Sequence, residues 1–362
     1  MFIVVSCSIL AILLTYLNSI DKNRDGMFIG FCLITFLAMI HYDYGNDYMS
    51  YYSVYLEISN FDSISQVLNM EVYREPGWAV LNYIFRYLGG FFSLVAIISL
   101  FEGIVYYKAI KHYLPKNLWV LGVFLYLIRT SFYLLNFSML RQGFAIAVFL
   151  ALWPWVEKKK WIPCVIILYI ISTIHSSALI LLPFCFWGYL PVKNSRVIAF
   201  SLIALLIALS FSTSLLVTVS ETVLETSESF QQYSGTYGQG STGSQFGVGA
   251  LIYLIPTIVT WYYLAYRAQT EECKRMAALS LVGTLITPFN TILPMVGRIG
   301  FYFSAYSIFV LPLAYVSIKD KGLRIALLSL YCLIVTYDYY VFFTSDVFRK
   351  HYQTFHTIFS QF

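Results

Sequence analysis

The stretch "EKKKWIPCVIILYIISTIHSSALILLPF" (residues 157–184) shows the pattern that decides the fold. A short basic cluster is followed by a long apolar run, and a single histidine, His175, interrupts that run near its middle. About 20 apolar residues are needed for a helix to cross the hydrocarbon of a bilayer. Each half of this run is shorter than that. The stretch therefore predicts two short membrane helices, 161–174 and 176–191, that meet at His175.

The rest of the 362-residue chain has the same character, with 59% hydrophobic and only 11% charged residues. Soluble domains average about 25% charged residues. We therefore expect an all-α, polytopic membrane protein of about 12 transmembrane helices, forming a single integral-membrane domain over residues 1–362. The first apolar run lacks a basic n-region and a cleavage site, so it is expected to be a retained span.

Apolar runs separated by polar breaks locate the predicted spans. They lie at 2–20, 27–41, 91–110, 117–135, 137–156, 161–174, 176–191, 197–219, 248–266, 276–294, 297–318 and 325–343. Most of the 23 Lys and Arg residues fall in alternate loops, which the positive-inside rule assigns to the cytoplasm. These loops are 21–26, 111–116, 157–160, 192–196, 267–275 and 319–324. Both termini, the segments 42–90 and 220–247, and the tail 344–362 are then predicted to face outward.

The outward segments differ in composition. Loop 220–247 is rich in Ser, Gly, Thr and Gln and carries only acidic charges, which is typical of a mobile segment, here a candidate lid. The first segment has an aromatic stripe at helical spacing, and the tail has another. The stripes consist of Tyr48, Tyr51, Tyr52, Tyr55 and Ile58, and of Phe348, Tyr352, Phe355, Phe359 and Phe362. Both predict anchors in the lipid headgroup region, and the first is alternatively a platform for stacking sugars.

Basic residues outside the cytoplasmic loops are mostly arginines. Apart from Lys108, which is counted with the loop that follows it, they are Arg74, Arg86, Arg129, Arg141, Arg298, Arg349 and Lys350. Outward arginines such as Arg74 suggest an anionic ligand, because the guanidinium suits bidentate contacts with phosphate. Arg141 and Arg298 also lie near the start of helices that run inward, where the helix dipole favours anions. A pyrophosphate would fit there, and the alternative is snorkelling or pairing with an acidic loop residue.

Acidic residues give a second set of candidates. Asp43 and Asp47 would share a face if their stretch is helical, and Glu75 precedes Pro76 at a predicted helix start. Carboxylates at the outer surface can align sugar hydroxyls or accept a proton from one, and the alternative is loop solvation and capping. Deep in the membrane, Glu102 and Arg129 are expected to form a buried pair, or else to line a polar cavity.

Several motifs occur in an order that resembles the EpsG/Wzy-like family of bacterial O-antigen and exopolysaccharide polymerases. They are "GNDYMSYYSVY", "REPGWAVLNYIF", "SMLRQGFAIAVFLALW", "EKKKW" followed by "ISTIHSSALILLPF", and "GRIGFYFSAYSIFVLP". The resemblance implies a GT-C-like glycosyltransferase of the bacterial inner membrane, with its active site facing the periplasm. It would move a glycan from undecaprenyl pyrophosphate onto the terminal sugar of another lipid-linked repeat unit, without a nucleotide sugar, cofactor or metal.

The resemblance also assigns roles to residues. It implies that His175, Asp47 and Glu75 are catalytic and that Arg141 and Arg298 bind substrate, to which Arg74 and Asp43 are added as outward polar residues. The chain departs from the family in loop 220–247, which has no Arg or Lys. Expected partners are lipid-linked glycans, membrane lipids and possibly a chain-length regulator protein, with no nucleic acid. Alternatives are a lipid-linked oligosaccharide flippase or transporter, an O-antigen ligase, and a noncatalytic membrane partner.

His175 is the residue with the most open interpretation. A histidine is partly neutral near pH 7 and can accept the proton of an attacking sugar hydroxyl. The alternative is a histidine that is merely hydrogen-bonded at a helix junction, in which case Asp47 or Glu75 would be the base.

Overall fold

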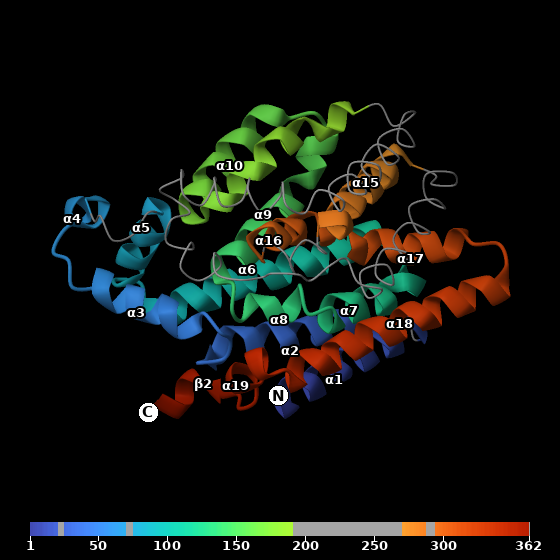
Figure 1. Cartoon of the computed structure of the whole chain (residues 1–362), viewed down its shortest axis with the longest axis horizontal. Helices are drawn as coiled ribbons and strands as arrows, with labels where there is room; N and C mark the ends of the chain where they lie inside the picture. The colour runs from blue at the N-terminus through green and yellow to red at the C-terminus, as the bar shows by residue number, and fades with distance from the viewer. Residues whose placement is uncertain (21–24, 70–74, 191–269, 287–293, 362) are drawn as a thin grey trace, which may run out of the picture. The chain divides into compact units, whose positions relative to one another are not determined.

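The computed structural model of the protein describes residues 1–20, 25–69, 75–190, 270–286 and 294–361 (Figure 1). These residues are almost wholly helical, with only two strands of two residues each. They form two compact units, Met1–Gly188 with Leu328–Phe362, and Tyr189–Leu327. Arg74, loop 192–196, loop 220–247, the predicted spans 197–219 and 248–266, and parts of loop 267–275 and span 276–294 lie outside the described residues.

The first unit is built on a series of packed apolar helices. They are α1 (Phe2–Ile20), α2 (Gly26–Ile40), α6 (Gly90–Tyr113), α7 (Trp119–Ile128, preceded by the 3₁₀ turn η1, Lys116–Leu118), α9 (Leu140–Glu157) and α10 (Trp161–Ile174). α1 packs on α2, α2 on α6, and α6 on α9. A side chain at Gly30 would lie 3.0 Å from the Ala11 carbonyl oxygen, so glycine is what lets α1 and α2 approach. Small residues at such contacts are typical of membrane helices.

Three of the described helices are long and apolar enough to cross a membrane. They are α1, α6 and α18 (Lys321–Thr344), which match the predicted spans 2–20, 91–110 and 325–343. Four further helical segments, Gly26–Ile40, Lys116–Ile128, Trp161–Ile174 and the 3₁₀ helix η2 (Ser176–Tyr189), are apolar but shorter. The all-α class is confirmed, and the apolar helices support a membrane protein. The figure of about 12 spans stays a prediction.

Two predicted spans are broken in the structure. Span 117–135 is not one helix, because α7 ends at Ile128, Arg129 has extended backbone and the chain resumes as the short α8 (Tyr133–Asn136). In the second unit, span 297–318 consists of α16 (Pro294–Ser304) and α17 (Ser307–Ser317), bent by 57° at the break. α15 (Glu271–Ile286) packs against both. Apolar periodicity alone does not show where such helices stop.

The first outer segment folds into a small helical group, α3 (Tyr48–Ile58), α4 (Ile64–Leu68) and α5 (Pro76–Phe85). Figure 1 shows these three helices together in blue. A small core of Ile58, Val67 and Ala79 holds them, and the Ser63 and Gln66 side chains form a capping box at the start of α4. This group carries Glu75 at the entrance to α5.

The C-terminal tail packs on the start of this outer segment. After α19 (Asp346–Tyr352), β2 (His356–Thr357) pairs antiparallel with β1 (His41–Tyr42), and η5 (Ile358–Gln361) follows. Tyr352 is buried against the ring of Tyr44 at 4.9 Å. The Met1 amino group donates to the Gln353 carbonyl oxygen at 2.6 Å, so the two ends lie together.

The aromatic stripes were predicted to lie in the headgroup region, and for several members this is wrong. Tyr48, Tyr51 and Ile58 of the first stripe and Tyr352 of the tail are buried within the protein. Tyr52 and Tyr55 remain half-buried, and the Tyr52 ring stacks on Phe92 at 5.8 Å. The helical spacing was predicted correctly for the first stripe, whereas in the tail α19 ends at Tyr352 and Phe355 and Phe359 lie beyond it. An apolar face that meets protein has the same pattern as one that meets lipid.

Candidate functional site

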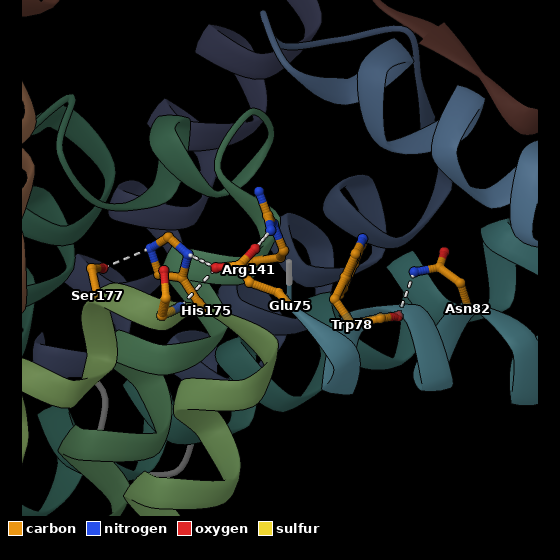
Figure 2. Close-up of polar contacts among 7 residues, drawn as sticks. Glu75, Trp78, Asn82, Arg141, His175 and Ser177 are labelled. Atoms are coloured by element: carbon orange, nitrogen blue, oxygen red, sulfur yellow. Dashed lines mark hydrogen bonds and ion pairs between the residues drawn. The ribbon is translucent and has the colours of Figure 1, made fainter. Parts of the chain in front are cut away.

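Three of the residues predicted for the site meet around the carboxylate of Glu75 (Figure 2). Glu75 directly precedes α5, Arg141 is the second residue of α9, and His175 separates α10 from η2. α10 packs against both α5 and α9, and this packing brings the three segments together. The sequence predicted all three on the outer side but did not predict that they touch.

The contacts of Glu75 use both of its oxygens. Oε2 forms an ion pair with Nη1 of Arg141, and Oε1 accepts a hydrogen bond of 2.7 Å from the backbone N–H of Ser176. Nδ1 of His175 lies 3.6 Å from Oε1. The side chains of Glu75 and Arg141 are each 14% exposed and that of His175 is 20% exposed. Solvent screening is therefore weak, and charges here interact more strongly than on an open surface.

The local sequence explains how Glu75 reaches across. Pro76 occupies the first turn of α5, and a residue before proline avoids helical backbone, so Glu75 stands at the N-cap with φ −114° and ψ 86°. Its side chain makes no capping hydrogen bond to α5. Gly77 lies so close to Thr173 of α10 that a side chain there would overlap the threonine hydroxyl. The "EPG" sequence thus positions the carboxylate against the end of α10.

His175 lies at the predicted junction of two helices. α10 ends at Ile174, and His175 has extended backbone with φ −146° and ψ 103° before η2 begins at Ser176. The predicted pair of short helices is confirmed, although the second is a 3₁₀ helix. The Ser177 hydroxyl lies 2.9 Å from Nε2 of His175. The imidazole therefore lies between a carboxylate and a hydroxyl.

Two aromatic rings hold the guanidinium of Arg141. Its Cζ lies 5.1 Å from the centre of the Tyr51 ring and 5.9 Å from that of Trp78, and the two rings meet edge to face at 5.6 Å. Such cation–π contacts strengthen when water is excluded. Trp78 is fully buried, and within the described part of the chain its indole N–H has no hydrogen-bond partner. Sequence analysis missed Trp78, although its position three residues after Glu75 in "EPGW" was a usable signal.

The other predicted site residues lie elsewhere or outside the described residues. Asp43 is exposed with a left-handed φ of 46°, and Asp47 is at the N-cap of α3, so the predicted shared helix face is wrong. The Asp47 backbone N–H donates to the Ser138 hydroxyl at 3.2 Å. Burial raises the pKa of the nearby Tyr352 phenol, and the Asp47 carboxylate adds to that shift. Arg298 lies half-buried on α16 of the second unit, and Arg74 is not described.

The predicted buried pair of Glu102 and Arg129 is wrong. Arg129 follows the last residue of α7, its Cζ lies 5.0 Å from the Phe132 ring, and its side chain is hydrogen-bonded to Tyr331. Glu102 is 3% exposed, and its Oε1 has no hydrogen-bond partner among the described residues. The early end of α7 is the physical reason that the two predicted neighbours do not pair.

His41 is held by the backbone at the end of α2. It follows the last residue of α2, is buried, and its Nδ1 lies 2.5 Å from the Ala38 carbonyl oxygen. Within the described ranges, no three His, Cys, Asp or Glu side chains gather as a metal site.

The fold and the site define a class, namely an all-helical membrane protein with a Glu–Arg–His cluster built from segments predicted to face outward. The chain matches the EpsG family over residues 26–355 and belongs to that family. Membership indicates a function of the polysaccharide-polymerase, glycosyltransferase-like type. No curated protein and no solved structure is detectably similar to the chain.

Proposed function

We propose that the protein is a polysaccharide polymerase that transfers a glycan from undecaprenyl pyrophosphate to the terminal sugar of another lipid-linked repeat unit. The reaction would take place at the periplasmic face of the bacterial inner membrane. The observation that carries the proposal is the meeting of Glu75, Arg141 and His175 in one partly dehydrated cluster, in a chain of the EpsG family. Such a transfer needs an anion stabiliser and a proton acceptor, and this cluster contains both.

Arg141 is the proposed stabiliser of the departing pyrophosphate. Its guanidinium has five N–H donors, so one edge can remain paired with Glu75 while the other N–H groups donate to a phosphate. Tyr51 and Trp78 hold the guanidinium in place before substrate arrives, which lowers the cost of reorganisation during the reaction. Its place in the first turn of α9 adds the favourable end of the helix dipole.

His175 is the proposed base, and the contacts of Glu75 favour His175 over Glu75 in this role. The Glu75 oxygens are already engaged by Arg141 and by the Ser176 N–H, so Glu75 is a poor acceptor for a further proton. The same carboxylate lies beside Nδ1 of His175, where it favours the tautomer with its lone pair on Nε2 and stabilises the imidazolium that forms. Glu75 therefore acts by orienting the base and the arginine.

The remaining parts of the proposal rest on sequence. Arg298 and Arg74 would contribute further positive charge to the pyrophosphate, and Asp43 and Asp47 would bind sugar hydroxyls. No cofactor or nucleic acid takes part, membrane lipids surround the protein, and a chain-length regulator protein is a proposed partner.

Reconstitution tests the reaction directly. Purified protein in liposomes would receive a radiolabelled lipid-linked repeat unit, and products would be separated by length. The proposal expects a ladder of lengthened glycans on the lipid and release of undecaprenyl pyrophosphate. Movement of the repeat unit across the bilayer without lengthening would support the flippase, and transfer only to an added lipid A acceptor would support the ligase. His175→Ala should insert normally and give no ladder, and a normal ladder from it would overturn the proposed base.

A further inference from the structure

The hydroxyl of Ser177 contacts Nε2 of His175, which is the nitrogen that accepts a proton in the proposed mechanism. Ser177 Oγ lies 2.9 Å from Nε2 of His175, while Nδ1 on the opposite side of the ring faces Glu75 at 3.6 Å. Figure 2 shows Ser177, the imidazole and Glu75 in a row. A sugar hydroxyl that approached Nε2 would meet the serine first.

The tautomer of His175 follows from its neighbours. A carboxylate accepts hydrogen bonds only, so the nitrogen that faces Glu75 is the one that carries the proton. Nε2 then holds the lone pair, and Ser177 donates its hydroxyl proton to it. A hydroxyl that donates one hydrogen bond still has lone pairs that can accept another. Ser177 can therefore receive a proton from outside while it passes its own to the ring.

The backbone holds Ser177 in this position. The Ala178 N–H donates to the His175 carbonyl oxygen at 2.9 Å, which closes the turn that contains Ser177. The Ser176 N–H is fixed to Glu75 at 2.7 Å, so the same carboxylate anchors this turn and faces the imidazole. Ser177 itself is only half-buried, so part of it remains open to a substrate. The serine is thus both rigidly placed and accessible.

We propose that Ser177 is a proton relay between the acceptor sugar and His175, an inference that rests on the proposed polymerase function. The acceptor hydroxyl oxygen forms a bond to the anomeric carbon of the donor glycan and gives its proton to Ser177 Oγ. The Ser177 proton passes to Nε2 at the same time, so the serine is neutral before and after. The bond from the anomeric carbon to the pyrophosphate oxygen breaks, and its electron pair leaves with the pyrophosphate. The imidazolium is then stabilised by Glu75.

A nucleophilic serine is the competing interpretation, because serine, histidine and an acid also form the triad of acyl-transfer enzymes. Here both oxygens of the acid are already engaged, by Arg141 and by the Ser176 N–H. In addition, glycosyl transfer to a sugar hydroxyl needs no acyl intermediate. The contacts therefore favour proton transfer through Ser177 over attack by it.

The test compares three variants in the liposome assay with the acceptor concentration varied. Ser177→Ala should lower kcat by at least about tenfold with KM nearly unchanged, because proton transfer is lost while the binding groups remain. Ser177→Thr keeps a hydroxyl and should recover most of the rate. Ser172→Ala is the matched control, since its hydroxyl donates only to the Tyr169 carbonyl oxygen one turn earlier on α10, and it should behave as wild type.

The outcomes separate the relay from the polymerase function. Wild-type kcat in Ser177→Ala, with wild-type protein active, would overturn the relay alone. A fall in the amount of folded protein with unchanged kcat per folded molecule would show a structural role and also overturn it. A covalent glycan adduct on Ser177 would show that the serine attacks the donor and would overturn the relay. Absence of any lengthened product from wild-type protein would instead overturn the proposed function.

Discussion

Glu75 and Glu102 are both largely shielded from water in the first unit, but their surroundings are opposite. Glu75 lies among an arginine, a backbone N–H and an imidazole, and each of these groups can interact favourably with its negative charge. Glu102 is 3% exposed on α6, and its Oε1 has no hydrogen-bond partner in the described ranges. Burial alone therefore does not identify a functional carboxylate. The hydrogen-bond donors around a carboxylate do identify it, because they stabilise its buried negative charge and orient it toward the reacting groups.

The largest effect is expected from Glu75→Gln. An amide cannot pair with Arg141 or stabilise an imidazolium at His175, so we expect the glycan ladder to fall at least about 100-fold. The ladder would be measured in a strain lacking the native copy and divided by the amount of folded protein. This correction is needed because breaking a buried ion pair typically costs about 3–5 kcal/mol, and less at 14% exposure. A full ladder from Glu75→Gln would contradict this prediction, because Glu75 would then be as dispensable for activity as we expect Glu102 to be.

A smaller but clear loss is expected from Arg141→Lys. Lysine keeps the charge but loses the planar fork and the contacts with Tyr51 and Trp78, so the rate should fall by about tenfold or more. Arg86→Lys is the control, because the Arg86 guanidinium also lies near an aromatic ring, that of Tyr87, but donates to a backbone carbonyl oxygen, that of Phe61. Equal rates for both lysine variants would show that Arg141 acts as a point charge.

Gly143→Ala tests the surroundings of Glu102. A methyl group at Gly143 would lie 2.6 Å from Asn136 Oδ1 and 2.8 Å from Glu102 Oε1, so a side chain must shift. We expect a loss of stability of about 1–3 kcal/mol, seen as a lower melting temperature in detergent. The double variant Gly143→Ala, Glu102→Ala should recover part of the loss. No recovery would indicate that the Glu102 side chain is not what the methyl group meets.

The smallest effect is expected from Glu102→Gln. The change keeps the volume and replaces a carboxyl group whose Oε1 has no hydrogen-bond partner in the described ranges, so stability should change by less than about 1 kcal/mol and the ladder should be normal. Melting temperature and ladder would be measured on the same preparation. Loss of the ladder with unchanged melting temperature would place Glu102 with Glu75 as a functional residue.

The sequence allowed the candidates to be predicted better than their contacts. Arg141 was identified because it is an outward arginine near a predicted helix start, His175 because it interrupts an apolar run, and Glu75 because it lies beside a helix-starting proline on the predicted outer side. That they meet depends on how α5 packs against α10, and no local pattern encodes this contact. The pairing of Arg141 with an acidic residue was only an alternative interpretation.

Other predictions failed where lipid and protein surroundings look alike in a sequence. The periodicity of α3 was correct, yet Tyr48 and Tyr51 face protein, because an apolar stripe fits either environment. The run 117–135 is apolar throughout its first half and does not show that α7 ends at Ile128. Because the end of this helix was misplaced, Arg129 was wrongly predicted to pair with Glu102. Helix ends are the least reliable part of such predictions.

The close approach of Gly77 to Thr173 has a consequence for how this site can vary among related chains. No side chain fits at Gly77 while a threonine hydroxyl occupies the facing position on α10. A family member with alanine or serine at the first position should therefore carry a smaller residue at the second, and the two substitutions should appear together. Correlated substitution at Gly77 and Thr173, which take no part in the proposed reaction, would then identify the contact that holds the Glu75 carboxylate in place.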